Sequence, residues 1–153
     1  MALYLVQHGK AVPREQDPEQ GLSREGIRDV ERIGMVAKGY GVRVASIQHS
    51  GKRRARQTAE ILASTLDSVQ EVREIPGIGP LDDATLLAPS LKSRDNRMLV
   101  GHLPFLEKLT STLLTGSADL RIFKFQNGGI VALDQDPESG SWYIKWTLMP
   151  HIS

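Results

Sequence analysis

The sequence predicts an α/β fold in which helices flank a mostly parallel sheet that has an antiparallel hairpin at one edge. Over most of the chain, short apolar segments typical of strands alternate with segments typical of helices. The last part of the chain instead holds strand-like segments, two of them joined by a turn rich in Asp, Pro, Ser and Gly. Alternation of strands and helices indicates parallel pairing, whereas a short polar turn between two strands indicates a hairpin.

The size and composition of the chain are those of one ordinary globular domain. A length of 153 residues favours a single domain over residues 1–153, with 40% hydrophobic and 24% charged residues. A net charge of +1 favours neither a nucleic acid nor a membrane as partner. The absence of cysteine excludes disulfides, thiolate metal sites and a cysteine nucleophile. The opening apolar run, Met1 to Val6, resembles neither a membrane span nor a signal peptide, so we expect a cytoplasmic protein.

The first part of the chain predicts one strand and one helix. Ala2 to Gln7 is a short apolar run with β-branched and aromatic members, which favours a buried strand. After a polar loop, Ser23 is a good N-cap for a helix whose apolar residues Ile27, Val30 and Ile33 recur at helical spacing. The glycines at positions 39 and 41 are suitable for ending it.

The middle of the chain predicts two more strands and two helices. We expect a strand over Val42 to Ile47, and a helix capped by Ser50 that runs to about Leu66. A third strand is expected over Val69 to Ile75, followed by a loop and a short helix within Asp83 to Leu91.

The rest of the chain predicts a strand–helix unit and then strands alone. The strand is Arg97 to Val100, and the helix starts near Pro104 and ends near Leu114. Three further strands are expected, over Arg121 to Phe125, Ile130 to Asp134, and Trp142 to Leu148. Trp142 and Trp146 are four residues apart on the last strand, so they should share a face.

Three of the four histidines come at or just after the ends of predicted strands. They are His8, His49 and His102, and Gly9 and Gly101 lie beside two of them. In open α/β sheets, ligands bind beyond the carboxyl ends of the strands. We therefore expect these imidazoles on one rim of the sheet.

The segment from Ser50 to Thr58 places a serine and four cations at the start of a helix. Cations oppose the helix dipole there, whereas free N–H groups and an arginine suit an anion such as a phosphoryl group. A solvated basic face is the alternative for Lys52, Arg53 and Arg56. A two-histidine metal site is a second alternative, although it needs a carboxylate as third ligand. The residues alone therefore indicate an anion site with two histidines.

Four segments in order resemble the histidine phosphatase superfamily, which includes the phosphoglycerate mutases. They are Leu5 to Ala11, with His8-Gly9; Leu22 to Gly26; Ser50 to Thr58, with Arg-Ala-x-Gln-Thr; and Val100 to Pro104, with Gly-His-Leu-Pro. The short chain and the Gly-His-Leu-Pro form are most similar to small phosphohistidine phosphatases of SixA type. The resemblance implies a phosphoglycerate mutase-like fold over essentially the whole chain.

The resemblance also implies roles for individual residues. His8 would be the nucleophile that accepts the phosphoryl group, Arg54 would clamp the phosphoryl oxygens, and His102 would donate to them. Ser50 and Gly9 would line the pocket. A histidine nucleophile must be neutral, so its second ring nitrogen should donate to a fixed acceptor such as a carbonyl. The resemblance implies no metal and no cofactor.

Two residues depart from the family pattern next to the nucleophile. Gln7 stands where the family has an arginine, which removes a charge expected on the phosphate. Lys10 stands where an acid is usual, and it either restores that charge or points into solvent. Together with Gln7, we therefore count Lys10 as a candidate phosphate-binding residue. His49 replaces a small residue, and we expect it to end its strand or to contact phosphate.

The general acid has only weak candidates, Asp82 and Asp83, which follow Pro80. A phosphoramidate leaving group needs less help from an acid, because an imidazole nitrogen readily accepts a proton. The sequence therefore favours a phosphatase that acts on phosphohistidine, or on a related phosphoramidate or phosphomonoester, through a phospho-His8 intermediate. The expected partner is a phosphorylated protein or a small phospho-substrate.

Two other functions stay open at the level of sequence. Because Gln7 lacks the charge of arginine, the domain is alternatively a module that binds phosphate or a phosphoprotein without turnover. Nucleic-acid binding through Lys52 to Arg56 is a weaker alternative, which predicts salt-dependent affinity.

Overall fold

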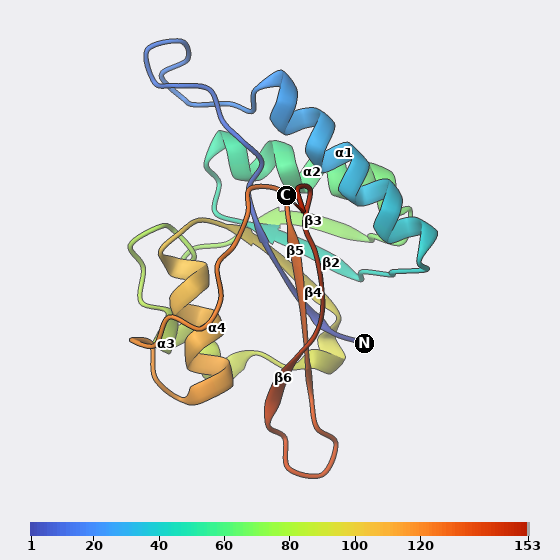
Figure 1. Ribbon diagram of the computed structural model, residues 1–153, viewed down its shortest axis with the longest axis vertical. Helices are drawn as coiled ribbons and strands as arrows, with labels where there is room; N and C mark the ends of the chain where they lie inside the picture. Colours follow the sequence, from blue (N-terminus) through green and yellow to red (C-terminus); the bar gives the residue numbers. More distant parts are fainter. Residues whose placement is uncertain (153) are drawn as a thin grey trace.

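The computed structural model describes residues 1–152, and six strands form one mixed sheet in the order β3-β2-β4-β1-β5-β6 (Figure 1). The strands are β1 (Leu3–Gln7), β2 (Ser46–His49), β3 (Glu71–Glu74), β4 (Arg97–Gly101), β5 (Ile130–Gln135) and β6 (Trp142–Leu148). Strands β1 to β4 pair in parallel, whereas β5 runs antiparallel to β1 and β6 antiparallel to β5. The predicted α/β class, with its antiparallel edge, is confirmed.

Helices cover both faces of the sheet and give it two separate cores (Figure 1). The α-helices are α1 (Arg24–Gly39), α2 (Arg53–Leu66), α3 (Ala84–Leu87) and α4 (Phe105–Thr115), and the short 3-10 helices are η1 (Ala88–Ser90) and η2 (Ser93–Asp95). In β1, Tyr4 and Val6 pack on the side of α1 and α2, whereas Leu3 and Leu5 pack on the side of α4. A strand that is buried on both faces needs apolar side chains at every position, and β1 has them from Leu3 to Val6.

Helix α1 begins where the sequence predicts, directly against the loop that follows β1. The Ser23 hydroxyl accepts a hydrogen bond from the Gly26 N–H (3.0 Å) and donates to the Lys10 carbonyl (3.1 Å). A Cβ atom at position 26 would overlap the Lys10 carbonyl oxygen. Glycine at this position therefore lets the helix approach the loop that carries the candidate nucleophile.

The second predicted strand and the cap of the second helix are wrong in position. Strand β2 starts only at Ser46, because the two residues before it do not continue the strand pairing. The Val44 N–H donates to Ser68 Oγ, and the Ala45 N–H donates to the Asn96 carbonyl. Helix α2 is capped by Lys52, not by Ser50. The Ser50 hydroxyl is two residues too early and faces the functional site, as described below.

Three other predicted elements are shortened or missing. The strand expected over Val69 to Ile75 is only β3, an exposed edge strand, and the helix expected within Asp83 to Leu91 is divided into α3 and η1. Arg121 to Phe125 forms no strand. Its alternating Phe123 and Phe125 stack edge to face (5.1 Å between ring centroids) and pack on the α4 side of the core.

The hairpin of β5 and β6 is confirmed, but the shared face of its two tryptophans is wrong. The register shifts between Ala132 and Leu133, so that Ala132 pairs with Trp146 while Leu133 pairs with Ile144. One extra residue in β6 reverses the direction of the side chains that follow it. Trp146 consequently packs on the core under α1 and α2, and Trp142 packs on the core under α4.

Among residues 1–152, no helix is long and apolar enough to cross a membrane.

Candidate active site

The carboxyl ends of β1, β4 and β2 bring His8, His102 and Ser50 together, as the strand order predicts. The backbone of His8 is fixed from two directions. Its N–H donates to the Gly101 carbonyl at the end of β4 (3.1 Å), and its carbonyl accepts from Asn127 Nδ2 (3.0 Å). The candidate nucleophile is therefore held between the neighbouring strand and the turn that precedes β5.

The imidazole of His8 has one nitrogen fixed as donor and the other as acceptor. Nδ1 lies 2.7 Å from the Gly9 carbonyl oxygen, which can only accept, so Nδ1 carries the proton. Arg54 Nε donates to Nε2 over 3.3 Å, so Nε2 has a free electron pair. The pKa of His8 is lowered to about 4, mainly by burial. The hydrogen bond to the Gly9 carbonyl opposes this shift, and the positive charge of Arg54 adds to it. The ring is therefore neutral near pH 7.

His102 lies beside His8 and is almost completely buried, with 1% of its surface exposed. The two ring centroids are 5.0 Å apart, and Ser50 Oγ lies 2.6 Å from His102 Nε2. Burial first, and then repulsion from His8, Arg54 and Lys52, lower the pKa of His102 to about 3. Ser50 thus orients a second neutral imidazole at the site.

Thr58 joins the loop after β1 to helix α2 and was missed as a site residue at the level of sequence. Its buried hydroxyl accepts from the Gly9 N–H (2.9 Å) and donates to the Arg54 carbonyl (2.8 Å). A Cβ atom on Gly9 would lie 2.9 Å from a methyl group of Val30, so the close approach requires glycine. The signal in the sequence is the spacing, since Thr58 lies one helical turn after Arg54.

Gln7 and Lys10, the two residues next to the nucleophile that differ from the family pattern, have different surroundings in the structure. Gln7 Oε1 is buried and has no hydrogen-bond partner within residues 1–152. Lys10 Nζ forms an exposed ion pair with Glu25 (2.8 Å), and this contact is the main reason that the pKa of Lys10 is raised. The charge of Lys10 is therefore already matched by a carboxylate.

Asp82 and Asp83 accept hydrogen bonds in their own loop. Asp82 Oδ2 accepts from the Gly79 N–H (2.7 Å), and Asp83 Oδ1 caps α3 by accepting from Thr85 N–H (2.9 Å) and the Thr85 hydroxyl. The Thr85 hydrogen bonds lower the pKa of Asp83. A carboxylate stabilised in its charged form is a poor proton donor.

His49 and His151 have neighbours that give them structural roles. His49, buried at the end of β2, accepts a hydrogen bond from the Gly51 N–H at Nδ1 (3.1 Å). His151 is exposed, and its Nε2 lies 3.0 Å from Asp29 Oδ2. Asn127, which lines the same cavity as His151, has a part in the site through its hydrogen bond to the His8 carbonyl.

A cavity of about 400 Å³ adjoins the site on the side of Gln7. Its lining consists of Gln7, Lys10, Glu25, Asp29, Leu103, Phe125, Gln126, Asn127 and His151. Oxygen and nitrogen atoms of Glu25, Asp29 and His151 lie within 4.8 Å of one another, as the ligands of a cation would. All three side chains already have polar partners: Glu25 pairs with Lys10, Asp29 pairs with Arg32, and His151 contacts Asp29.

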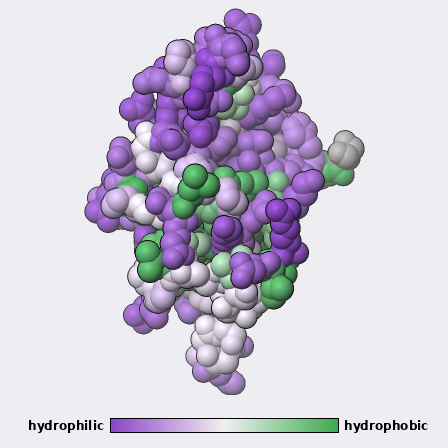
Figure 2. All heavy atoms as spheres, turned by 90° about the vertical axis from the view of Figure 1, so that its left-hand side faces the viewer, coloured by the Kyte–Doolittle hydropathy of each residue, from purple (hydrophilic) through white to green (hydrophobic). Residues whose placement is uncertain are grey.

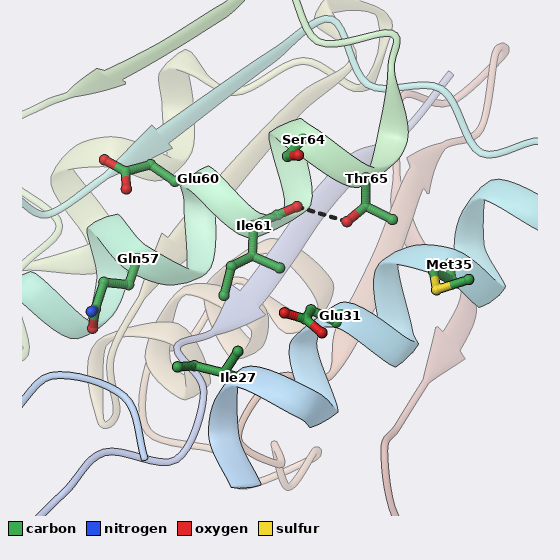
Figure 3. Close-up of a pocket in the computed structure, with 8 residues that line it drawn as sticks. All are labelled: Ile27, Glu31, Met35, Gln57, Glu60, Ile61, Ser64 and Thr65. Carbon is green, nitrogen blue, oxygen red and sulfur yellow. Dashed lines mark hydrogen bonds between the residues drawn. The ribbon is translucent and has the colours of Figure 1, made fainter. Parts of the chain in front are cut away.

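A larger cavity, of about 580 Å³, lies between α1 and α2 and is not the candidate active site (Figure 3). Its lining side chains come from the two helices, and none of them is a histidine or an arginine. The chemistry therefore lies at the rim of the sheet and not in this groove.

Solved structures with the same fold cover nearly the whole chain. The protein histidine phosphatase SixA, solved with tungstate, has a TM-score of 0.83 and 24% identity, over 98% of this chain and 97% of that one. A candidate phosphohistidine phosphatase SixA from Agrobacterium tumefaciens has a TM-score of 0.76 and 25% identity, over 97% of both chains. A mycobacterial glucosyl-3-phosphoglycerate phosphatase, solved with VO3, has a TM-score of 0.73 and 15% identity, over 95% of this chain and 97% of that one.

A search of curated protein sequences finds no match, whereas a comparison with protein-family models does. The family model of the histidine phosphatase superfamily (branch 1) matches residues 3–79, which is half of the chain and includes His8, Ser50 and Arg54. The chain therefore belongs to the histidine phosphatase superfamily.

Proposed function

We propose that the protein is a metal-independent phosphatase that hydrolyses phosphohistidine, or a related phosphoramidate or phosphomonoester, through a covalent phospho-His8 intermediate. The observation that carries this proposal is the state of the His8 ring. Its Nδ1 proton is bound to the Gly9 carbonyl, and its Nε2 electron pair points toward the Arg54 guanidinium. A neutral nucleophile beside a fixed cation is the arrangement that phosphoryl transfer requires.

In the first step, the Nε2 electron pair of His8 forms a bond to phosphorus as the bond from phosphorus to the leaving nitrogen or oxygen breaks. The leaving atom keeps that electron pair and takes up a proton from solvent. In the second step, a water oxygen attacks phosphorus and releases a proton to solvent, the bond to Nε2 breaks, and its electron pair returns to the ring. Arg54 moves its hydrogen bond from Nε2 to a phosphoryl oxygen, so the same cation stabilises both transition states.

The substrate class follows from the leaving group. Asp82 and Asp83 are ordered by hydrogen bonds within their own loop, and Asp83 is stabilised as a carboxylate. A leaving imidazole nitrogen accepts a proton readily and needs no strong acid from the protein. The fold shared with the histidine phosphatase SixA supports the same choice. We extend the proposal to a phosphorylated protein or a small phospho-substrate as partner, to one domain over residues 1–153, and to a cytoplasmic location.

A second candidate function is phosphate or phosphoprotein binding without turnover. Gln7 is the observation that favours it, because its uncharged amide stands where the family has an arginine. Neutral hydrogen bonds are about half as strong as charge-assisted ones. The site would then hold a phosphoryl group without lowering the barrier enough for reaction.

The test is hydrolysis of a phosphohistidine peptide and of an aryl phosphate with EDTA present, with the mass of the intact protein followed during turnover. We expect turnover, a transient phosphoryl adduct, and a faster reaction with the phosphohistidine peptide. His8→Ala should abolish both turnover and adduct. His49→Asn is the control, because His49 contacts the Gly51 backbone and not the His8 ring. Phosphate binding without adduct or turnover would establish the binding module instead.

A further inference from the structure

The turn of residues 126–129, which leads into β5, is bonded to two consecutive carbonyls at the candidate nucleophile. The Gly128 N–H donates to the Gln7 carbonyl (2.8 Å), and Asn127 Nδ2 donates to the His8 carbonyl (3.0 Å). A displacement of this turn therefore either moves the backbone of His8 with it or breaks both hydrogen bonds.

The outer side of the turn is held by the segment after β6, residues 149–152. Gln126 Nε2 donates to the His151 carbonyl (2.9 Å), and Gln126 Oε1 accepts from the His151 N–H (3.2 Å), so one amide bonds this segment in both directions. A Cβ atom on Gly129 would overlap Met149 Sδ, which shows how closely the segment packs on the turn. In Figure 1 the end of β6, near the label C, lies beside the orange segment that enters β5.

The segment after β6 is anchored in turn to helix α1. Arg32 Nη2 donates to the Pro150 carbonyl (2.7 Å), and His151 Nε2 lies 3.0 Å from Asp29 Oδ2. Because a carboxylate oxygen accepts, this ring nitrogen carries the proton. Asp29 is only 8% exposed and also accepts from Arg32 (3.2 Å), so its position is fixed within α1. The segment therefore connects a buried carboxylate of α1 to the turn at His8.

Hydrogen bonds, more than apolar packing, hold the end of this segment. His151 and Ile152 are exposed. Figure 2 shows mostly hydrophilic residues over the upper part of the face that it draws, and β1 ends in the upper part of Figure 1. Chain that buries little apolar surface contributes little to the stability of the core. These contacts can consequently be removed one at a time without unfolding the protein.

We propose that the segment after β6 is a positioning element for the nucleophile and acts on the His8 backbone through Gln126 and Asn127. The His8 ring must meet its acceptor at one nitrogen and phosphorus at the other, so a shifted backbone misdirects both. A misplacement of about 1 Å can lower a rate on the order of 100-fold. This inference rests on the proposed function for the reaction that His8 performs. Gln126 and His151 act through the turn, and they are positioning residues.

The test compares Gln126→Ala with Gln135→Ala, a matched control at the other end of β5. Gln135 is also half-buried, and its amide accepts from the Ser93 N–H (3.0 Å) and donates to the Gly140 carbonyl (3.2 Å). Each variant loses two hydrogen bonds of one glutamine, so the two Tm values should fall by similar amounts. Only Gln126→Ala should lower kcat for the phosphohistidine peptide, by about 10- to 100-fold, with KM nearly unchanged.

Further variants show whether the effect passes through the turn. His151→Gln keeps an N–H donor for Asp29 and should retain most of the activity, whereas His151→Ala should lower kcat. In the Asn127→Ala background, Gln126→Ala should have little further effect, because substitutions that act in series are not additive. A rise in KM alone would make Gln126 a substrate contact and overturn the proposal, as would full additivity of the two substitutions.

The His8 ring also reports its position without turnover. In protein that contains isotope-labelled histidine, the NMR signals of His8 Nδ1 and Nε2 should shift in Gln126→Ala and stay in place in Gln135→Ala. Unchanged His8 signals in Gln126→Ala, or an unchanged kcat, would overturn the proposal. Failure of the proposed function looks different: the unmodified protein would then hydrolyse neither substrate, and the His8 signals would still decide whether the segment positions the ring.

Discussion

The two imidazoles of the site are neutral for the same main reason, which is burial. Their hydrogen-bond partners differ: a carbonyl and a guanidinium hold the His8 ring, whereas the Ser50 hydroxyl contacts the His102 ring. The sequence predicts that these histidines meet on one rim, because each follows a parallel strand. Their protonation depends on burial and on neighbours from other segments, which the order of residues does not reveal.

Thr58 and Asn127 show why sequence reasoning misses supporting residues. Thr58 is 49 residues from Gly9, and Asn127 is 119 residues from His8, yet each bonds the backbone beside the nucleophile. Their residue types are ordinary in a helix and in a turn. Only the packing of α2 and of the β5 turn against the end of β1 gives them a part in the site.

The buried hydroxyl of Thr58 can be tested by removing it without changing the shape of the side chain. Thr58→Val should leave the Gly9 N–H and the Arg54 carbonyl without this partner, at a cost of about 1–3 kcal/mol in the free energy of unfolding. It should also lower kcat for the phosphohistidine peptide. Thr58→Ser keeps the hydroxyl and should retain most of the activity. Urea unfolding and steady-state kinetics check this, and equal losses in both variants would contradict it.

At the scale of elements, the sequence predicts best those strands that have an apolar partner on both sides. Strands β1 and β4 were predicted to within a residue or two, because each is a short buried run between polar loops. Arg121 to Phe125 has the alternation of a strand but pairs with none, since its phenylalanines are used to cover α4. Alternation shows which side chains are buried, and it does not show whether a neighbouring strand is available.

Helix α1 contains two glycines that should respond oppositely to substitution. Gly26→Ala would push a methyl group into the Lys10 carbonyl and separate α1 from the loop after His8. Gly39→Ala meets no atom within 4 Å and gains helix propensity of up to about 1 kcal/mol. We expect a lower Tm and lower activity for Gly26→Ala, and an equal or higher Tm for Gly39→Ala. Calorimetric melting of the two variants checks this; comparable Tm values would refute the close approach.

At the scale of the whole molecule, the fold class and the rim of the sheet were predictable, because alternation of strands and helices restricts the topology strongly. The direction of the side chains in β6 was not predictable, because it depends on one unpaired residue opposite Ala132 and Leu133. The docking of the loop over residues 11–20 was not predictable either. It depends on ion pairs between segments more than 30 residues apart, such as Glu19 and Arg53.

The lowered histidine pKa values predict how stability depends on pH. His8 and His102 have a pKa of about 4 and about 3 in the folded protein, against 6.5 when unfolded. The unfolded chain therefore binds more protons below pH 6.5, and stability should fall as pH drops from 6.5 toward 4. His49, whose pKa is also lowered by burial, adds to the same trend.

Urea unfolding between about pH 4.5 and 7.5 measures this trend. The free energy of unfolding should be nearly constant above pH 7 and decline steadily below 6.5, by on the order of 2 kcal/mol or more at the acid end. His102→Asn should make the curve visibly shallower, because one of the protons taken up on unfolding is removed. A curve that is flat down to pH 4.5 would show that these rings are protonated while folded.

The irregular pairing of β5 and β6 also places one tryptophan, an intrinsic fluorescent probe, on each face of the sheet. The chain has only two tryptophans, and the register shift turns them toward opposite faces of the sheet. Trp142→Phe leaves an indole that reports the layer of α1 and α2, and Trp146→Phe leaves one that reports the layer of α4. If the two emission changes have the same denaturant midpoint, both layers melt together; different midpoints would show that one face of the sheet loses its helices first.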